Sequence, residues 1–531
     1  MRVNVPSVTP QFLRSRIGKV CVAIIGATPA EMLEKASAVV KETPFLEFRL
    51  DYLEKPLLAL PKLKHFLFDN TAVTAIATCR RAANGGKFSG SLASEIEVLS
   101  KAGATGFHIV DLELESAEAL KKGEIQKLRD TGVALIISHH DFAATKDLDG
   151  VYKRIAPFKP DFIKIVPTAK TLTDNVTLMR FIERMDDHSN IIGICMGDAG
   201  IISRVLGLRA GSAFTFAAAT SGEETGPGQI AARTLIETYR IDQVDAATKV
   251  YGVAGNPIRS SLSPIMMNTA FRRETVNAVY LALQANKLAD LLKLVHEIPI
   301  QGFSVTMPLK QEIMAHLEKT DPLSAKIGAC NTVLRAQDGK LYGFNTDVAG
   351  IIGPLEKRMS LRGAKALVLG AGGAARAAVF GLRDKGADVF ILNRTPETAQ
   401  KLARQSGSKT IKKDALAKTS FDVIINATPV GMAGIKSVPL LEAKDLNTKL
   451  VFELVYNPLE TPLLRLARQK SIPIITGIEM FVQQGARQFE IWTGKPAPEE
   501  EMLRVVIHAL RQQAEAVTDT PAPAAKTKKA S

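Results

Sequence analysis

Cysteine is scarce in this sequence, with four in 531 residues. The four lie far apart, at positions 21, 79, 195 and 330, so the chain has neither a disulfide framework nor the paired spacing of a zinc site. Long apolar runs are also missing, and none reaches the length of a membrane-spanning helix. These absences predict a soluble protein of a reducing compartment, with no metal centre and no membrane partner.

Acidic residues are fewer than basic ones, 54 against 68, which gives a formal net charge of +14. Such an excess would suit a nucleic-acid-binding protein if the basic residues were clustered. They are instead spread along the chain, and the one dense run is at residues 526–529. We therefore expect small anionic substrates as partners and no nucleic acid.

Both ends of the chain differ in composition from the rest. The first twenty residues hold three arginines and no acid, which faintly resembles a transit peptide. However, a strand-like run starts near Val20 with no signal-type apolar core before it, so we interpret these residues as a short lead-in and expect a cytoplasmic protein. Residues 517–531 are mainly Ala, Pro, Thr and Lys, too polar and proline-rich to pack, and are predicted to be disordered.

The length is too great for one ordinary domain and predicts two to four. In the first half, eight apolar strand-like runs alternate with segments of helical periodicity such as 29–41, 92–102 and 172–185. The eight runs are at residues 20–27, 45–52, 73–79, 106–114, 133–139, 162–166, 191–196 and 212–219. Parallel strands joined by helices over this length indicate a (β/α)₈ barrel, although the last connections are short.

In such a barrel the active site lies at the C-terminal ends of the strands. Polar side chains gather there in this sequence, namely Glu47, Arg49, Arg80, Asp111, Glu113, His139 and His140. Lys164 stands apart because it lies between two isoleucines. If it faces the interior, burial would lower the pKa of its amine and free it to attack a carbonyl. If it packs outward, its head would reach water. The segment alone leaves both orientations open.

The motifs around these residues make the first half similar to the type I 3-dehydroquinate dehydratases over nearly its full length. The motifs are Glu47-Phe48-Arg49-Leu50-Asp51, Ser138-His139-His140-Asp141-Phe142, Ile202-Ser203-Arg204 and Thr225-Gly226-Pro227-Gly228-Gln229. The chain departs from the family pattern at Asn84, where many members have Glu before the Gly-Gly pair, and at Thr225, where serine is common. We expect these departures to affect substrate positioning and not the Schiff-base chemistry.

The resemblance implies roles for individual residues. Lys164 becomes the Schiff-base lysine. His140 becomes the general acid/base, which takes a proton from the carbon next to the iminium and helps the hydroxyl leave as water. The implied substrate contacts are Glu47, Arg49, Arg80, Arg204, Thr225 and Gln229. Structural alternatives are His140 as a core histidine and Glu47 with Arg49 as an ion pair.

A glycine-rich turn organises the second half. An apolar run ending at Leu369 leads into Gly370, Gly372 and Ala375, then a helical segment, then a second strand ending at Leu392. This order and spacing predict a Rossmann dinucleotide site at a helix N-terminus. The second strand is followed by Asn393-Arg394-Thr395 in place of the acidic residue typical of NAD sites. We therefore expect NADP, with the guanidinium on its 2′-phosphate, the alternative being a solvated surface arginine.

A new strand and turn begin at residues 249–257, and we place a domain boundary at 245–249. From Gly252 to about Arg487 the chain is similar to the shikimate dehydrogenases. The substrate-domain motifs are Asn256-Pro257, Ser261-Leu262-Ser263-Pro264, Val305-Thr306-Met307-Pro308-Leu309-Lys310, Gly328-Ala329-Cys330-Asn331-Thr332 and Asn345-Thr346-Asp347. The cofactor-domain motifs are Asn426-Ala427-Thr428-Pro429, Val455-Tyr456-Asn457-Pro458 and Gly477-Ile478-Glu479-Met480.

By this resemblance Lys310 and Asp347 form the catalytic pair, in which the lysine supplies a proton to the ketone oxygen as hydride is delivered. The implied substrate contacts are Ser261, Ser263, Thr306, Asn331, Tyr456 and Gln484. The implied cofactor contacts are Gly370, Ala371, Gly372, Gly373, Ala374, Asn393, Arg394, Thr395, Thr428 and Gly477. Simpler local roles are also open: Ser263 and Asp347 could cap helices, and Lys310 could be an exposed helix lysine.

Together the two resemblances imply consecutive reactions of aromatic-precursor biosynthesis in one α/β chain, in the domain order of plant bifunctional proteins. The expected organisation is a barrel at 1–245, a substrate domain at 249–350 completed by helices at 480–515, and an NADP-binding Rossmann domain at 351–479. The expected partners are small anionic cyclohexane and cyclohexene carboxylates. A quinate dehydrogenase in the second half and a non-catalytic sensing protein are alternatives, and monomer and homodimer are both open.

Overall fold

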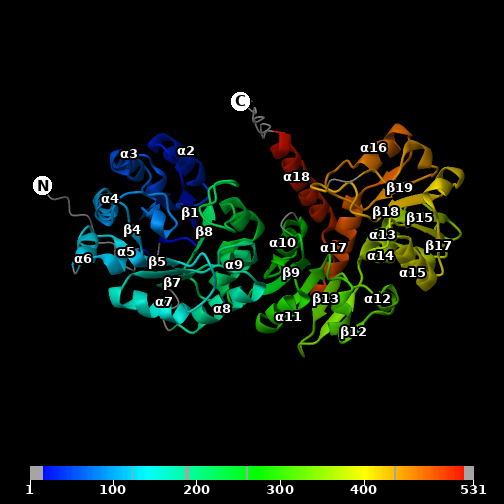
Figure 1. Ribbon diagram of the computed structural model, residues 1–531, viewed down its shortest axis with the longest axis horizontal. Coiled ribbons are helices and arrows are strands. Elements are labelled where there is room, and N and C mark those ends of the chain that lie inside the picture. Colours follow the sequence, from blue (N-terminus) through cyan, green and yellow to red (C-terminus); the bar gives the residue numbers. More distant parts are fainter. Residues whose placement is uncertain are drawn as a thin grey trace, which may run out of the picture. The chain divides into compact units, whose positions relative to one another are not determined.

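The computed structural model of the chain describes residue 13 and residues 16–121, 123–185, 190–258, 261–435 and 438–518. The chain forms two compact units (Figure 1), of which the first comprises Met1–Lys249 and Leu283–Pro299, and the second Val250–Ala282 and Ile300–Ser531. Most of the predicted disordered tail lies outside the described residues, but positions 517 and 518 close the last helix and were wrongly assigned to that tail. Within the described ranges, no helix combines the length and apolar character needed to cross a membrane.

The first unit is built on one eight-stranded parallel sheet of order β7-β6-β5-β4-β3-β2-β1-β8. Its strands are β1 (Val20–Ile24), β2 (Phe45–Arg49), β3 (Thr74–Thr78), β4 (Ile109–Glu113), β5 (Ala134–His140), β6 (Phe162–Val166), β7 (Ile191–Gly193) and β8 (Thr215–Ala218). At the two edges, the backbone amide of Ala213, just before β8, donates to the carbonyl of Ile191 in β7 at 2.7 Å. The predicted eight-stranded barrel is confirmed, and it is nearly closed.

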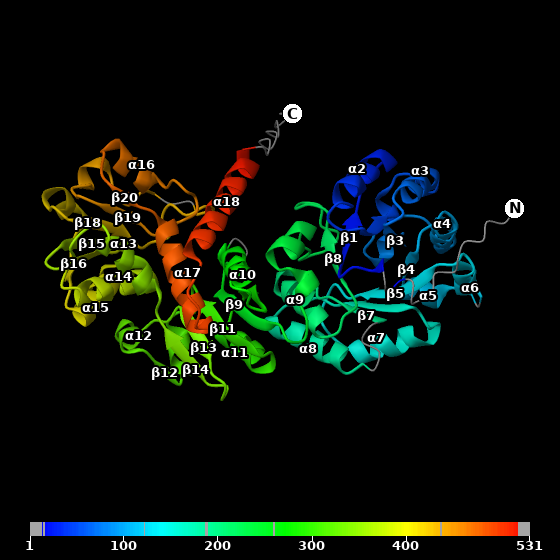
Figure 2. The same ribbon diagram turned by 180° about the vertical axis from the view of Figure 1, so that it is seen from behind.

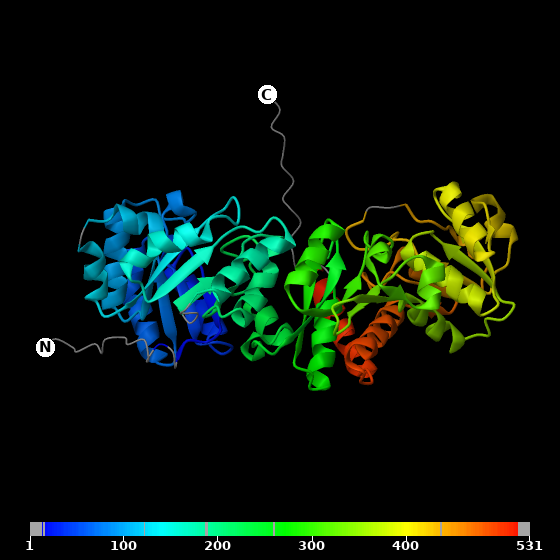
Figure 3. The ribbon, with the colours of Figure 1, turned by 90° about the horizontal axis from the view of Figure 1, so that it is seen from below.

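Helices lie outside the strands of the barrel and connect them (Figures 2 and 3). They are α2 (Pro29–Val39), α3 (Pro56–Asp69), α4 (Leu92–Ala104), α5 (Leu114–Ala119), α6 (Glu124–Arg129), α7 (Leu148–Ile155), α8 (Leu172–Glu183) and α9 (Ile201–Arg209). Helix α2 starts where the sequence predicts, because the Thr28 hydroxyl accepts from the amide of Glu31 and Pro29 lies in the first turn. The same compact unit includes α11 (Leu288–Glu297), whose Asp290 carboxylate accepts from the backbone amides of Leu172 and Thr173 at the start of α8.

Alternation along the strands sorts the barrel interior into layers, because side chains two positions apart point to the same face. Near the N-terminal ends of the strands the inward side chains are apolar and share one buried core, including Phe45, Ile76, Ile109, Ile136 and Phe162. Two positions further along the same strands stand the buried polar residues Glu47, Thr78, Asp111, Ser138 and Lys164. The fold therefore places a polar layer on top of an apolar floor, at the end of the barrel where active sites form.

The second unit contains a six-stranded sheet of order β10-β9-β11-β13-β14-β12. Its strands are β9 (Lys249–Gly255), β10 (Ala278–Gln284), β11 (Ile300–Val305), β12 (Lys319–Thr320), β13 (Thr332–Arg335) and β14 (Leu341–Phe344). Helices α10 (Ser263–Arg273), α17 (Gly477–Thr493) and α18 (Glu499–Thr518) share one apolar core with β9 and β10. Helices from the end of the chain thus pack beside α10, as Figures 1 and 2 both show.

A parallel six-stranded sheet of order β17-β16-β15-β18-β19-β20 forms the rest of the second unit. Its strands are β15 (Lys365–Leu369), β16 (Asp388–Leu392), β17 (Lys409–Thr410), β18 (Val423–Asn426), β19 (Val451–Glu453) and β20 (Ile474–Ile475). Its helices are α14 (Gly373–Asp384), α15 (Pro396–Ser406) and α16 (Pro462–Gln469), and α12 (Pro322–Ile327) and α13 (Asp347–Glu356) precede it in the chain. The strand order is that of a Rossmann fold, in which the ligand crevice opens between β15 and β18, where the order reverses.

Candidate active sites

Lys164 faces the barrel interior, which settles the orientation that its own segment left open. Only 6% of its side chain is exposed, and Nζ donates to Oδ2 of Asp111 at 2.8 Å. Oε1 of Glu47 lies 3.8 Å from Nζ, and the ring of Phe216 lies 3.9 Å beneath it. The surroundings are therefore not the purely apolar ones that two flanking isoleucines suggest. Two carboxylates and an aromatic face fix the amine at the mouth of the barrel.

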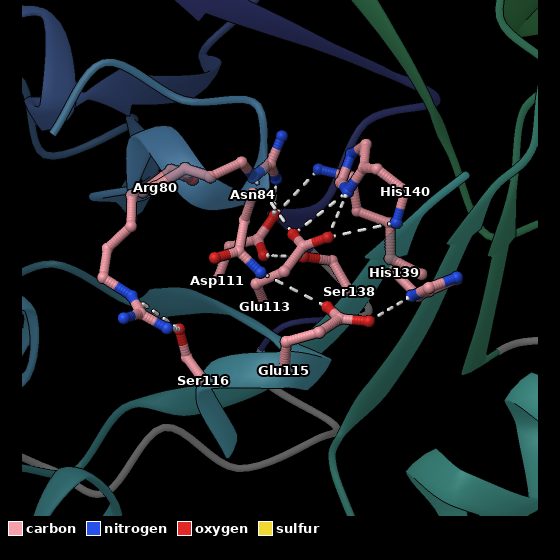
Figure 4. A network of polar contacts seen from close by, with 12 residues as sticks. Arg80, Asn84, Asp111, Glu113, Glu115, Ser116, Ser138, His139 and His140 are labelled. Atoms are coloured by element: carbon pink, nitrogen blue, oxygen red, sulfur yellow. Dashed lines mark hydrogen bonds and ion pairs between the residues drawn. The ribbon is translucent and has the colours of Figure 1, made fainter. Parts of the chain in front are cut away.

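His140 lies beside Glu113, and each carboxylate oxygen is 3.0 Å from Nδ1 of the imidazole (Figure 4). The backbone amide of His140 also donates to Glu113 at 3.0 Å. Burial, together with the positive charges of Arg80 and Lys164, lowers the pKa of His140 well below its ordinary value. A neutral imidazole held at Nδ1 leaves Nε2 as the nitrogen that can exchange protons with a substrate.

Ser138 links the two carboxylates of this layer, with Oγ 2.5 Å from Asp111 and 2.9 Å from Glu113 (Figure 4). A hydroxyl has a single proton, so it cannot donate to both at once. Burial raises the pKa of Asp111, but Lys164 and Arg80 outweigh this effect and hold that pKa below its usual range. Burial raises the pKa of Glu113 to about 7. Near neutral pH, Glu113 is therefore the carboxyl that can hold a proton.

Arg80 is the cation of this layer that has an unused hydrogen-bond donor. Its Nε lies 3.1 Å from Glu113, whereas its Nη2 is 3.6 Å from Asp111 and has no hydrogen-bond partner among the described residues. A buried guanidinium with a free donor suits an anionic or hydroxylated ligand. Arg49, by contrast, is bound through Nε and Nη2 to Asp51, and Glu47 accepts from the hydroxyl of Thr78 at 2.7 Å. The alternative of a Glu47–Arg49 ion pair is therefore wrong.

The remaining predicted contacts of the barrel lie around one loop. Arg204 is buried and donates to the backbone carbonyls of Gly228 at 2.8 Å and Phe216 at 3.2 Å. Oε1 of Gln229 accepts from the backbone amide of Thr225 at 2.6 Å and from its hydroxyl at 3.1 Å. In this structure Arg204 holds the backbone of the loop, and Thr225 holds the side chain of Gln229.

Asn84, the departure from the family pattern, takes part in a separate contact chain. Its amide donates to Glu115 at 3.4 Å, and Glu115 lies 2.9 Å from Nδ1 of His139 (Figure 4). The hydrogen bond to Glu115 raises the pKa of His139, so these two residues form an ion pair. Asn84 therefore contacts Glu115, the partner of His139, whereas the carboxylate beside His140 comes from Glu113.

In the second unit, Lys310 and Asp347 lie together although 37 residues separate them. Nζ donates to Oδ2 of Asp347 at 2.5 Å, and Nδ2 of Asn331 donates to the other oxygen at 2.7 Å. The lysine side chain is 17% exposed and the carboxylate 4%. Helix α13 begins at Asp347 after Thr346, with no side-chain cap, so the capping and exposed-lysine alternatives are wrong. The arrangement presents an ammonium that a buried carboxylate holds in place.

The predicted substrate contacts of this unit come from five segments. The loops after β9 and β11 adjoin, since the amide of Asn256 donates to the carbonyl of Met307, next to Thr306. Ser261 Oγ accepts from the backbone amide of Ser263. The N-cap residue of α10 is Leu262, so the alternative that Ser263 caps this helix is wrong. The Tyr456 hydroxyl hydrogen-bonds to the backbone of Leu262, and Gln484 accepts from Asn331 at 3.4 Å.

The glycine-rich turn has the shape that a dinucleotide requires. Gly370 has φ 110°, and a Cβ there would lie 3.0 Å from Thr428. Gly372 precedes α14, and nothing lies within 4 Å of the position of its missing Cβ, so the backbone is open to a phosphate. Ala371 is buried, and Gly373 and Ala374 form the first turn of α14. These features fit a dinucleotide cofactor, whose pyrophosphate would lie at this helix N-terminus.

The other cofactor positions follow the ends of neighbouring strands. Asn393, Arg394 and Thr395 follow β16, with Arg394 exposed and the Asn393 amide donating to the carbonyl of Thr395 at 3.0 Å. The amide and hydroxyl of Thr428 donate to Oδ1 of Asn426 after β18. Gly477 begins α17, where a Cβ would lie 2.4 Å from the carbonyl of Val455. All five positions lie at the carboxyl edge of the sheet, where nucleotides bind in this fold.

Sequence reasoning missed several residues of both sites. Asp111 and Glu113 were noted as polar strand ends but received no role, although their spacing from buried Ile109 places them on the interior face. Phe216 has no polar signal and could not have been found from its type. In the second unit, Glu453 is fully buried and accepts from the amide of Asn426, which in turn holds Thr428. A buried acid at a strand end is the signal that could have revealed it.

Family models match both units. A type I 3-dehydroquinase model matches residues 20–246. A shikimate dehydrogenase substrate binding domain matches residues 253–333, a shikimate/quinate 5-dehydrogenase model matches 355–449, and a shikimate 5′-dehydrogenase C-terminal domain matches 477–507.

Individual relatives agree with these matches. The chain is 33% identical over 509 residues to the chloroplastic bifunctional 3-dehydroquinate dehydratase/shikimate dehydrogenase of Arabidopsis thaliana, covering 91% of this chain and 83% of that protein. Over 278 residues it is 40% identical to the shikimate dehydrogenase (NADP(+)) of Pyrococcus furiosus, covering 51% and 99%. A solved shikimate 5-dehydrogenase of Thermus thermophilus, in complex with NADP(H) and shikimate, is 36% identical with a TM-score of 0.46 and covers 50% of this chain and 100% of that one.

Proposed function

The chain belongs to the family of bifunctional 3-dehydroquinate dehydratase/shikimate dehydrogenases, and from this premise we propose which of its residues perform each reaction. The barrel is a type I 3-dehydroquinase, which removes water from 3-dehydroquinate to give 3-dehydroshikimate. The second unit is an NADP-dependent shikimate dehydrogenase, which reduces 3-dehydroshikimate to shikimate. The two active sites therefore act in succession on one carbon skeleton.

In the barrel, Lys164 adds its amine to the ketone of 3-dehydroquinate and water leaves to form an iminium. His140 takes the proton from the neighbouring carbon, and the electron pair of that C–H bond expels the hydroxyl group. His140 returns the proton to the departing hydroxyl, which leaves as water, and hydrolysis of the iminium then frees Lys164. The observation that supports this assignment is a buried Nζ at the strand ends, in one polar layer with a neutral imidazole.

Charged groups around the lysine bind and orient the substrate. Asp111 and Glu47 hold Nζ in place, and Arg80 offers a buried donor that the protein leaves without a hydrogen bond among the described residues. The loop at residues 225–229 is held in shape by hydrogen bonds of Arg204, Thr225 and Gln229. Arg49 is held by its ion pair with Asp51. Small anionic carboxylates with several hydroxyls suit this mixture of donors and acceptors.

Trapping with borohydride tests this half. Borohydride added with 3-dehydroquinate should reduce the iminium and leave a mass adduct on Lys164, which peptide mapping would locate. The Lys164→Ala protein, treated in the same way, should take up no adduct. An unmodified Lys164 in protein that still dehydrates the substrate would overturn the assignment.

In the second unit, Lys310 gives a proton to the ketone oxygen of 3-dehydroshikimate as negative charge develops there, and Asp347 holds the ammonium in position. NADPH, when bound, supplies the hydride. Gly372 and the N-terminus of α14 would hold its pyrophosphate, and Arg394 would pair with its 2′-phosphate. The carboxylate and hydroxyls of the substrate bind to the side chains of Ser261, Ser263, Thr306, Asn331, Tyr456 and Gln484.

The most direct test of the whole proposal starts from the first substrate. Purified protein supplied with 3-dehydroquinate and NADPH should yield shikimate, and the Lys310→Ala protein should stop at 3-dehydroshikimate. Formation of shikimate by the Lys310→Ala protein at an undiminished rate would contradict the proposed proton donor.

For the compartment, we propose the cytoplasm. The four cysteines are all buried and unpaired, which suits a reducing environment. A fluorescent fusion of the full chain should distribute through the cytoplasm, and its accumulation in an organelle would contradict the proposal.

A further inference from the structure

A continuous line of hydrogen bonds runs behind the catalytic pair of the second unit. The hydroxyl of Tyr280 in β10 lies 2.6 Å from Oγ of Ser304 in β11, which donates to Oε1 of Gln488 in α17 at 2.7 Å. On its other side, Gln488 donates from Nε2 to Oγ1 of Thr332 at 3.0 Å and to the carbonyl of Asn331 at 3.3 Å. All five side chains are buried, so each polar group depends on its protein partner.

The line has a direction. Ser304 has a single proton and donates it to Oε1 of Gln488, so the hydroxyl of Tyr280 is the donor to Ser304. The proton of Ser304 then points to Gln488, which fixes the carbonyl oxygen of that amide on the Ser304 side and the NH₂ group on the Thr332 side. Because Oγ1 of Thr332 accepts from this NH₂ group, its own proton points onward to Oδ1 of Asn331, 2.7 Å away.

At its far end the line meets the catalytic carboxylate. Oδ1 of Asn331 accepts from Thr332 and also from the backbone amide of Thr346 at 2.8 Å, so the nitrogen of the same amide must face the other way. That nitrogen donates to Oδ1 of Asp347 at 2.7 Å. Oδ2 of Asp347 is thereby left to accept from Lys310. The orientation of the Asn331 side-chain amide therefore decides which oxygen of Asp347 is free to accept from Lys310.

We propose that Thr332 and Gln488 are positioning residues for the reduction, acting on Asp347 and Lys310 through the amide of Asn331. Among the described residues no hydrogen bond joins either residue to Lys310, and the two come from different elements, β13 and α17. A line of buried groups with a single consistent direction holds the carboxylate more rigidly than an apolar filling would. This inference rests on the proposed roles of Lys310 and Asp347.

The test compares Thr332→Val with Thr332→Ser. Valine keeps the shape of threonine but leaves Nε2 of Gln488 and Oδ1 of Asn331 each short of one partner, so kcat for reduction of 3-dehydroshikimate should fall roughly five- to a hundredfold. The KM values for NADPH and substrate should stay nearly unchanged. Serine retains the hydroxyl and should restore kcat. Gln488→Met, which removes both ends of the amide at similar length, should repeat the effect of valine.

Two controls separate the possible outcomes. The melting temperature and NADPH affinity of each variant report whether the second unit is folded, and Asp347→Asn measured beside them reports on the catalytic pair. If Asp347→Asn loses activity while Thr332→Val and Gln488→Met keep theirs, the positioning inference is overturned and the proposed function stands. If the valine and methionine variants lose kcat only together with cofactor binding and thermal stability, the line is merely structural, which also overturns the inference. Full activity of Asp347→Asn would overturn the proposed pair itself.

Discussion

The side chain of Lys310 crosses over Gly373, and a Cβ built at position 373 would lie 3.1 Å from Cδ of the lysine. Gly373 is the first residue of α14, directly after the dinucleotide turn. The proposed proton donor and the cofactor turn therefore share a van der Waals surface within the second unit. A substitution at Gly373 should therefore displace the lysine side chain.

This contact gives a matched pair of glycine variants. Gly373→Ala should push the lysine from its position and lower kcat of the reductase by about tenfold, because small misplacements of a catalytic group are costly. Gly372→Ala meets nothing within 4 Å, so the fold should tolerate it, but its methyl group would occupy the open side of the turn and raise the KM for NADPH. Steady-state kinetics on 3-dehydroshikimate distinguishes the two effects. A rise in KM alone for Gly373→Ala would contradict the contact with Lys310.

Cofactor preference should depend on Arg394. Its guanidinium would form a charge-assisted contact with a dianionic 2′-phosphate, worth roughly 1.5–3 kcal/mol, so Arg394→Ala should weaken NADPH binding about ten- to a hundredfold and hardly affect NADH. Lys449→Ala removes another exposed cation of the same domain, one already paired with Asp422, and should leave both affinities unchanged. Equal losses for NADPH and NADH in Arg394→Ala would show that this residue supports the fold instead.

The dehydratase should gain activity as the pH rises through about 7. Burial raises the pKa of Glu113 to about 7, whereas burial lowers the pKa of His140, which is therefore neutral over this range. Protonated Glu113 donates to Nδ1 and places the imidazole proton on Nε2. Ionised Glu113 accepts from Nδ1–H and leaves Nε2 free as the base, so the higher-pH form is the active one.

Glutamine at this position should remove the pH effect. In Glu113→Gln the rise of kcat near pH 7 should be absent, because the amide does not titrate. Burial also raises the pKa of Glu95 to about 7, but Glu95 contacts Arg81 and Ser116 and not His140. Glu95→Gln should therefore keep the rise. A pH profile of kcat that is the same in Glu113→Gln and in the unmodified protein would exclude Glu113 as the titrating group.

Each active site should work without the other. Lys164→Ala should abolish water loss from 3-dehydroquinate yet leave NADPH-dependent reduction of added 3-dehydroshikimate near its original rate. Lys310→Ala should do the reverse, with a loss on the order of 10²–10⁴ in kcat of the reductase. The reason is that each set of interacting side chains lies within one compact unit. A hundredfold loss of reductase activity in Lys164→Ala, with an unchanged melting profile, would mean that the sites are coupled.

The fold could be predicted because its signals are local and repeated. Eight apolar runs separated by helical segments specify a barrel, and the glycine spacing after β15 specifies a Rossmann turn. The direction of Lys164 could not be predicted from its own segment, because it depends on which face of β6 meets the barrel interior. Phe162, two positions earlier and part of the interior core, shows in the structure which face that is.

Side-chain partners were harder to predict than strands. Ser263 and Asp347 each stand at a helix start, where capping and catalysis leave the same local signature. A catalytic role is distinguished from capping by a side-chain partner far along the chain, such as Lys310 for Asp347. Arg49 had acidic residues two positions away on both sides, and it pairs with Asp51, in the turn that follows the strand. Gln488 had no local signal at all, since its partners come from β11 and β13.

The return of α17 to the sheet of β9–β14 has a consequence for synthesis on the ribosome. The last strand of that sheet ends at Phe344, but the helix that supplies Gln484 and Gln488 begins at Gly477, after all the strands of the Rossmann sheet. At usual elongation rates this interval takes about 7–27 s. Throughout it, Asn331, Thr332 and Ser304 lack their glutamine partners, and the apolar face that later packs against Phe489 and Trp492 is uncovered. The nascent chain can therefore hold a working dehydratase well before it holds a working reductase.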